Sequence, residues 1–365
     1  MNINEYMVKE ARLIRALDGR NLRLAVLSRG DSFSWLTSGG NFQVSTASEY
    51  GPAILLIGKD RRILIAYTMD GRRILEEELP GLGFELVELR WFDESIQEKA
   101  LHVIGNDSYI SDAPLGSQPP DPGFFQMLHY PLTEAEQIRY RNLAKTAEQI
   151  LFDVALQARP GMKESDIARQ LNRYYADYGM SAPVMIIGSD ERIARYRHCL
   201  PTDKTIEKVL LLAPAIRRHG LCVPISRMVS WGTPDHDLLK IYHALLVIEA
   251  GTLAACTPGT SFLKISETQK RLFRELGYEK EWELHFQGGL TGYIINDPTR
   301  CRDPHTFIEM GQAFNWYITI SGAKVEETIL VGERGPEIIS QNGIWPLREI
   351  ESNSKRFLLP DILIQ

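Results

Sequence analysis

The stretch His285–Pro298, HFQGGLTGYIINDP, constrains the interpretation of this chain more than any other segment. A histidine opens it, glycines follow at Gly288, Gly289 and Gly292, and it ends in Asn-Asp-Pro. The glycines lack the GxGxxG spacing, and no helix with a ribose-binding acid is expected after them. We therefore do not expect a nucleotide-binding loop, and we expect a strand-like segment over residues 283–289.

The segment before this stretch repeats an arrangement found earlier in the chain. A helix with a capping box at Thr133 and Glu136 runs to about residue 158, stops at Pro-Gly and precedes a second helix and a strand over 183–189. The same order recurs from Asp235 to residue 289, with the Pro-Gly pairs 98 residues apart. A tandem α-α-β duplication predicts pseudo-twofold halves with a site at their junction. The alternative is that Pro-Gly is ordinary punctuation after a helix.

The first part of the chain has the pattern of a small α/β domain. Helical periodicity covers residues 4–18, and short apolar runs at 22–27, 53–58 and 62–67 predict strands. Gly58-Lys59-Asp60-Arg61 is expected to form a hairpin turn, and the Pro- and Gly-rich segment 116–123 to form a linker. We predict an amino-terminal domain at 1–125 and a larger domain at 126–365.

Composition favours a globular chain in a reducing compartment. The chain has 365 residues, 44% of them hydrophobic, and a net charge of −6. This balance favours neither nucleic acid nor a membrane as partner, and the amino terminus lacks the apolar core of a signal peptide. No run approaches about 18 apolar residues. Four cysteines without CxxC spacing fit a cytoplasmic location.

Five motifs in order resemble the creatinase, prolidase and aminopeptidase P superfamily. They are RPGMKESDIA (159–168), HCLPTDKTI (198–206), VLLLAPAIRRHGLCVPISRMV (209–229), the opening stretch, and GQAFNWYITISGAKVEETILVGERGPEIIS (311–340). The resemblance implies an α/β (α+β) chain with a small amino-terminal domain and a carboxy-terminal pita-bread domain. It also implies a homodimer, by analogy only.

The same resemblance calls the metal chemistry of that superfamily into question. Its peptidases hold two metal ions with two Asp, one His and two Glu, because hard cations need anionic oxygen and imidazole ligands. Residue by residue, those positions fall on Ala213, Pro224, Gly289, Tyr317 and Glu326. Only Glu326 keeps its ligand type, so we expect no metal and no other cofactor.

Three residues remain as candidates for catalysis. His198 lies where the superfamily has an active-site His that acts as general base and acid in metal-free creatinase, and its ordinary pKa suits proton transfer. His285 matches an outer His near the substrate. Glu326 needs a partner if it lines a dry pocket, and Lys324 on the same strand face is the expected one. An isolated surface His is the alternative for His198.

Lys324 and two other residues are candidates for substrate binding. Asn296 matches a second His of the family segment and can hydrogen bond but not titrate. Tyr317 would project into the space of the missing metal and either fill it or polarise a carbonyl. A simple turn at Asn296-Asp297-Pro298 and core filling by Tyr317 are the alternatives. The basic cluster Arg192, Arg195 and Arg197 is either solvated or attracts a carboxylate.

Three functional hypotheses follow. The first is a metal-independent, creatinase-like hydrolase that cleaves a C–N bond of a small amino-acid-like or short-peptide substrate, with His198 as general acid and base. The second is a catalytically inactive pita-bread protein that binds a peptide, protein or small ligand. The third is an Xaa-Pro metallopeptidase with a rearranged metal site.

Overall fold

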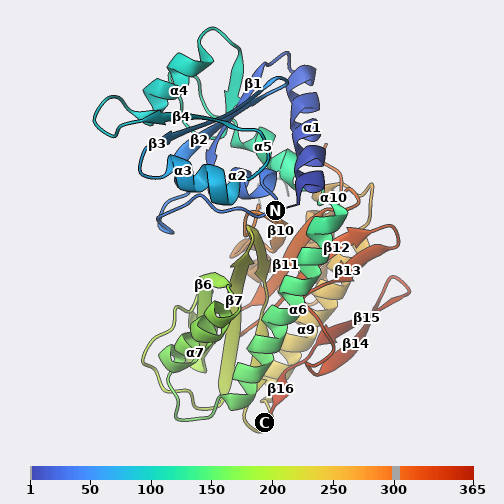
Figure 1. Cartoon of the computed structure of the whole chain (residues 1–365). Helices are drawn as coiled ribbons and strands as arrows, with labels where there is room; N and C mark the ends of the chain where they lie inside the picture. Colours follow the sequence, from blue (N-terminus) through green and yellow to red (C-terminus); the bar gives the residue numbers. More distant parts are fainter. Residues whose placement is uncertain (1, 298–304) are drawn as a thin grey trace. The chain divides into compact units, whose positions relative to one another are not determined.

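The computed structural model describes residues 2–297 and 305–365 (Figure 1). Pro298 and one of the four cysteines, Cys301, lie outside these residues. The chain divides into two compact units, each described by itself. The first comprises Met1–Tyr130 and His219–Leu221, and the second comprises Pro131–Arg218 and Cys222–Gln365.

Helices and strands alternate along the first unit, in agreement with its apolar pattern. They are α1 (Ile3–Gly19), β1 (Leu24–Arg29), α2 (Gly30–Leu36), β2 (Tyr50–Gly58), β3 (Arg61–Tyr67), α3 (Gly71–Arg73), the π-helical turn η1 (Ile74–Glu78), β4 (Glu85–Leu89), α4 (Ile96–Ile104), β5 (Tyr109–Ser111) and α5 (Pro122–His129). The predicted linker segment 116–123 leads directly into α5, whose first turn is capped by the Asp121 carboxylate.

A five-stranded sheet of order β4-β3-β2-β1-β5 forms the centre of the first unit. β2 and β3 are antiparallel and joined by the predicted turn at residues 58–61. Val26, Leu56 and Ile65 point to one face, where α4 contributes Ile96 and Ala100 to a buried cluster. Alternate residues of the same strands are also buried on the opposite face, so both sides of this sheet are covered.

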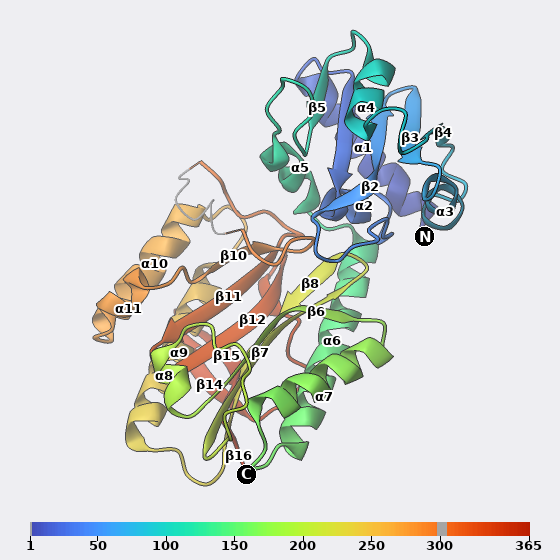
Figure 2. The ribbon, with the colours of Figure 1, turned by 90° about the vertical axis from the view of Figure 1, so that its left-hand side faces the viewer.

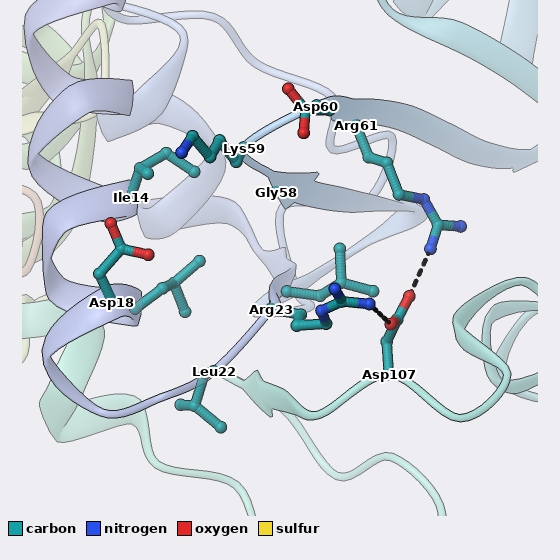
Figure 3. Close-up of a pocket in the computed structure, with 11 residues that line it drawn as sticks. Ile14, Asp18, Leu22, Arg23, Gly58, Lys59, Asp60, Arg61 and Asp107 are labelled. Atoms are coloured by element: carbon teal, nitrogen blue, oxygen red, sulfur yellow. Dashed lines mark hydrogen bonds and ion pairs between the residues drawn. The ribbon is translucent and has the colours of Figure 1, made fainter.

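Figure 3 shows a hollow of about 300 Å³ in the first unit, between α1 and the β2–β3 turn. Arg23 and Arg61 both donate to the Asp107 carboxylate, at 3.1 and 2.9 Å. Asp18 and Lys59 lie at its edge and are exposed. The charges inside the hollow therefore compensate one another, as on an ordinary protein surface.

The second unit contains the two predicted copies of the α-α-β arrangement. Its elements are α6 (Glu134–Gln157), α7 (Glu164–Asp177), β6 (Ser181–Ser189), α8 (Glu191–Arg195), β7 (Val209–Arg218), β8 (Leu221–Pro224), β9 (Arg227–Ser230), α9 (His236–Ala255), α10 (Phe262–Glu275), α11 (Glu279–Glu283), β10 (Gly288–Thr291), β11 (Ala313–Ile320), β12 (Ala323–Gly332), β13 (Gly335–Ile338), β14 (Leu347–Ser352), β15 (Lys355–Pro360) and β16 (Leu363–Ile364).

The copies correspond as α6-α7-β6 and α9-α10-β10, and each third strand pairs antiparallel with the next strand, β7 or β11. The duplication is thereby confirmed. One detail was wrong, because residues 279–283 form α11 and the strand begins only at Gly288. The backbone at Gly288 has φ +115°, which favours glycine and turns the chain into the strand there.

The two larger sheets of the second unit meet where β9 approaches β12. Ser226 and Glu326 form an isolated bridge at this junction, with the Ser226 amide donating to the Glu326 carbonyl at 3.3 Å. Helices α6 and α9 lie beside the strands (Figure 1), with α6 contacting β7 and α9 contacting β11 and β12. Strands of both larger sheets contribute side chains to the cavity described below.

Helix α9 is long and apolar enough to cross a membrane, by length and composition only. In the structure it is a core helix. Leu245, Leu246 and Ile248 are fully buried, and the helix packs against β11, β12 and β14. Its hydrophobicity is thus explained by burial within the second unit.

Glu249 lies among the apolar residues of α9 and is only 1% exposed. Neither carboxylate oxygen has a hydrogen-bond partner among the described residues. Burial, followed by the nearby Glu327 charge, raises the pKa of Glu249 well above its usual value. The folded protein therefore keeps a proton on Glu249 that the unfolded chain releases above a pH of about 4.5.

Replacing Glu249 with methionine is expected to stabilise the protein by about 1–3 kcal/mol. The substitution removes an unpaired buried polar group and puts an apolar side chain of similar length in its place. The advantage should grow as pH rises from about 5 to about 8, since the wild type loses stability as pH rises through this interval. Urea unfolding at both pH values measures it. Glu267→Met, on the exposed side of α10, is the control. A destabilised Glu249→Met protein at the higher pH would contradict this account.

Candidate functional site

A cavity of about 170 Å³ lies within the second unit. Many of its lining residues belong to β6, β7, β11 and β12, whose ribbons can be followed in Figure 2. An engineered cavity of about 150 Å³ holds benzene, so this one has room for a small molecule or one group of a larger one. All six residues expected at the site line it, and so do several apolar side chains. The lining comprises Val184, Ile186, His198, Ala213, Pro214, Ala215, Pro224, His285, Phe286, Ile295, Asn296, Asn315, Tyr317, Lys324 and Glu326.

Lys324 and Glu326 form an ion pair in the wall of the cavity. The Lys324 ammonium lies 2.7 Å from the Glu326 carboxylate, and the two side chains are 9% and 6% exposed. Alternation along β12 places both on one face of the strand. The Ser226 hydroxyl also donates to the Glu326 carboxylate. Glu326 is therefore neutralised by protein groups, as a carboxylate at this depth requires.

His198 and His285 come together at the cavity mouth from distant parts of the chain. Their Nε2 atoms lie 3.3 Å apart, and His285 Nδ1 contacts the Phe286 carbonyl oxygen. Because a carbonyl only accepts, His285 Nδ1 carries the proton and its Nε2 accepts. His198 Nε2 is then the donor, which leaves the His198 Nδ1 lone pair as the basic atom of the pair.

Both imidazoles are held neutral by their surroundings. Burial, opposed by the Phe286 carbonyl, lowers the pKa of His285 to about 4. Burial and then the Lys324 charge also lower the pKa of His198, while Glu326 acts in the opposite direction. A neutral His285 can accept the shared hydrogen bond, and a neutral His198 keeps a lone pair on Nδ1.

Aromatic rings form one wall of the cavity. Tyr317 lies directly opposite Glu326 across the β11–β12 pair. Its ring meets the rings of His285 and Phe286 edge-on, at centroid distances of 5.4 and 5.5 Å. The Lys324 ammonium lies 5.4 Å from the Tyr317 ring centroid. Tyr317 therefore both fills volume and faces the charged pair.

The side chains at the superfamily's metal positions do not fit a dinuclear metal centre. Ala213 and Pro224 line the cavity but offer no side-chain donor, and Tyr317 offers only a phenol. Glu326 is the single carboxylate there and is already paired with Lys324. Across residues 2–297 and 305–365, no group of three His, Cys, Asp or Glu is placed to hold a metal ion.

The fifth position, Gly289, is closed to a larger side chain by the chain itself. A Cβ atom there would lie 2.4 Å from the Asp297 carbonyl oxygen and 3.0 Å from its carbon. The Asp297 amide donates to the Leu290 carbonyl at 2.8 Å, which folds the chain back over the glycine. A histidine at Gly289 would require this backbone to move, so the lost ligand cannot be restored by one substitution.

Asn315 is a cavity residue that the sequence analysis missed. It lies two residues before Tyr317 on β11, so the strand alternation that selected Tyr317 also places Asn315 on the cavity face. The basic cluster, in contrast, is mostly used within the protein. Arg192 pairs with the buried Glu164, and Arg197 pairs with Glu281. Only Arg195 of that cluster is exposed.

A second charged cluster lies on the opposite face of β12. Arg227 is fully buried and contacts Glu327 at 2.6 Å and Glu148 at 2.7 Å, and it also donates to the Ser340 carbonyl at 2.8 Å. Burial raises the pKa of Glu327 to about 7, although Arg227 acts against the shift. The cluster joins β9, β12 and α6 beneath the cavity and so fixes the strands that carry Glu326.

Comparison with known proteins agrees with the motifs. Metallopeptidase family M24 matches residues 139–333. Uncharacterized peptidases of Staphylococcus epidermidis and Staphylococcus aureus are 23% identical over 222 residues. The match covers 57% of this chain and 62% of those relatives, so the chain matches less than two thirds of their length.

Solved structures show the same fold over nearly the whole chain. An Xaa-Pro dipeptidase from Bacillus anthracis has a TM-score of 0.78 and 19% identity, covering 99% of this chain and all of the other. Dipeptidase PepE from Mycobacterium ulcerans has a TM-score of 0.80 and 15% identity, covering 100% and 99%. The N-terminal domain of FACT complex subunit SPT16 from chickpea has a TM-score of 0.71 and 11% identity, covering 94% of this chain and 97% of the other. The fold is thus the expected pita-bread fold with an amino-terminal domain, and the chain belongs to metallopeptidase family M24.

Proposed function

We propose that this chain is a metal-independent hydrolase that cleaves a C–N bond of a small amino-acid-like or peptide-like substrate. The main support for this proposal is that the metal-ligand positions have changed while the candidate catalytic residues are present. Four of five metal-ligand positions hold residues that cannot ligate in the family manner, whereas His198, His285 and Glu326 line one cavity. The structural relatives named as dipeptidases act on small peptides, which supports the substrate class.

His198 supplies the proton transfer in this proposal. Its Nδ1 takes a proton from water as the water oxygen attacks the substrate carbon, and the same atom returns that proton to the leaving nitrogen. The C–N bond breaks, a C–O bond forms, and one water is consumed. His285 holds the required tautomer of His198 through the contact between the two Nε2 atoms.

The remaining polar groups stabilise and orient. Negative charge that develops on the substrate oxygen is stabilised by the Lys324 ammonium, which the Glu326 carboxylate holds in the cavity wall. Tyr317 packs against His285 and positions the substrate beside it. The apolar side chains of the cavity exclude water, which strengthens these electrostatic interactions.

The proposal is tested by turnover after chelator treatment. Purified protein, dialysed against EDTA, is incubated with N-acyl amino acids, dipeptides and amino-acid amidines, and amine release is measured. We expect release that persists in chelator and does not increase with added Mn²⁺, Zn²⁺ or Co²⁺. Activity that appears only with one of these metals would overturn the proposal and favour a rearranged metal site.

A second candidate is a binding protein without turnover. It is favoured by Ala213 and Pro224, which replace ligands without adding chemistry, and by the likeness to a subunit of the FACT complex. In this case no substrate of the panel is cleaved, while a peptide or small ligand raises the melting temperature. The homodimer and the cytoplasmic location stay predictions, to be checked by light scattering and by fractionation.

A further inference from the structure

Two asparagine side chains in the cavity wall carry hydrogen-bonding atoms that no described residue satisfies. Both amide atoms of Asn296, Oδ1 and Nδ2, are shielded from solvent and unpaired. Asn315 is 1% exposed and donates from Nδ2 to the Glu327 carbonyl at 3.4 Å, but its Oδ1 is unpaired. A buried polar atom that stays without a hydrogen-bond partner destabilises the folded protein. Three such atoms at one cavity indicate a ligand that forms hydrogen bonds with them.

The fold places these two amides on either side of Gly289. Asn315 is the register partner of Gly289 across the β10–β11 pair. Asn296 Oδ1 lies 3.2 Å from the point where a Gly289 Cβ would stand. The Thr291 hydroxyl donates to the Ile295 carbonyl at 2.8 Å and fixes the turn that returns Asn296 to the strand. The absence of a side chain at Gly289 is therefore what allows the two amides to share one region.

The charges around this region are already compensated. Lys324 and Glu326 neutralise each other at 2.7 Å. A ligand group with a net charge would lose its hydration on entering the cavity without gaining an unpaired counter-charge from this pair. A neutral group with both donors and an acceptor avoids that cost.

We infer that Asn296 and Asn315 form a recognition site for a neutral carboxamide or ureido group. The ligand C=O accepts from Asn296 Nδ2 while a ligand N–H donates to Asn296 Oδ1, which makes a reciprocal pair of hydrogen bonds. A second N–H of the ligand donates to Asn315 Oδ1. A carboxylate ligand has no donor for Asn296 Oδ1 and Asn315 Oδ1. An amidinium ligand has no acceptor for Asn296 Nδ2.

The inference rests on the proposed function only in assigning this group to the substrate, because recognition itself needs no turnover. It also defines the direction in which a substrate lies in the cavity. The amide group is held at Gly289, and the reacting bond lies toward the His198–His285 pair. A ligand with one terminal carboxamide and a second C–N bond satisfies both parts.

The test uses three probes of the same shape, butanamide, butanoate and butanamidinium, each about as large as the benzene that a comparable cavity holds. Binding is measured on the full chain carrying His198→Gln, labelled with ¹⁵N-asparagine, from the shifts of the side-chain amide signals. Butanamide is expected to bind about tenfold or more tightly than the two charged probes. Equal affinity for all three would overturn the inference.

Two substitutions assign the effect to Asn296. Asn296→Leu should weaken butanamide about tenfold or more, because it removes the reciprocal pair. Asn296→Asp has nearly the same shape and keeps only acceptors, so it should reverse the preference toward butanamidinium. It also decides the question if the leucine variant does not fold. Asn106→Asp, exposed in the first unit, is the charge-matched control and should leave all three affinities unchanged.

The outcomes separate the inference from the proposed function. If butanamide binds selectively but the wild type turns over no substrate, the recognition site is supported and the proposed hydrolase activity is rejected. A different result would reject the recognition site and support the proposed hydrolase. In that case turnover persists in chelator, the three probes bind equally well, and Asn296→Asp does not reverse their order of affinity.

Discussion

Replacing Arg227 with methionine is expected to lower the free energy of unfolding of the second unit by about 3–5 kcal/mol. The substitution keeps most of the side-chain volume but removes the cation that contacts Glu148 and Glu327, both of which are buried. It also leaves the Ser340 carbonyl without this donor. Two uncompensated carboxylates at this depth must either stay charged at high cost or take up protons.

The loss should depend on pH in a defined direction. Burial already holds the pKa of Glu327 near 7, above its value in the unfolded chain. Without Arg227 this pKa rises further, so the folded variant binds more protons than the unfolded chain and loses stability as pH rises. Urea unfolding should show a larger loss at about pH 8 than at about pH 6.

Arg141→Met is the matched control, because Arg141 makes an equally short contact with Glu337 on the surface, at 2.7 Å. Exposed pairs of this kind contribute about 0–1 kcal/mol. If both arginine variants lose the same amount, burial does not govern the Arg227 cluster. A loss in Arg227→Met without any dependence on pH would show that packing, rather than charge, is what the residue contributes.

Replacing His198 with alanine is expected to lower kcat about 10²–10⁴-fold on whichever substrate the chelator-treated protein cleaves. The reason is the loss of the only basic atom that the two-histidine contact leaves available. KM should change much less, because the recognition site is formed by Asn296 and Asn315. His243→Ala, on the exposed side of α9, is the control.

The pH profile distinguishes a catalytic role from a structural one. The base must be neutral, so kcat/KM should fall with decreasing pH as His198 takes up a proton. Burial and Lys324 lower the pKa of His198, and the fall should therefore occur below the usual histidine range. Lys324→Met removes one cause of this shift and should move the fall to higher pH. An His198→Ala enzyme with unchanged kcat would contradict the mechanism.

Local sequence determined much of the fold because the relevant signals act over short distances. The capping box at Thr133 and Glu136 begins α6, as the contacts of both side chains show. Short apolar runs identified β1, β2 and β3 of the first unit, and the Pro-Gly stops marked the duplication. The strand predicted at residues 283–289 failed because its boundary depends on the φ of Gly288 and on pairing with β11, neither of which is a property of those residues alone.

The sequence also determined which residues could not be metal ligands, since Ala213, Pro224 and Gly289 lack donor side chains in any fold. Only the tertiary structure decided what takes the place of that chemistry. The contact of His198 with His285 joins residues 87 positions apart, and Ser226 reaches Glu326 across 100. Asp297 closes the space at Gly289 because a turn folds its backbone over the strand. Such contacts depend on the pairing of whole strands, and no local pattern encodes them.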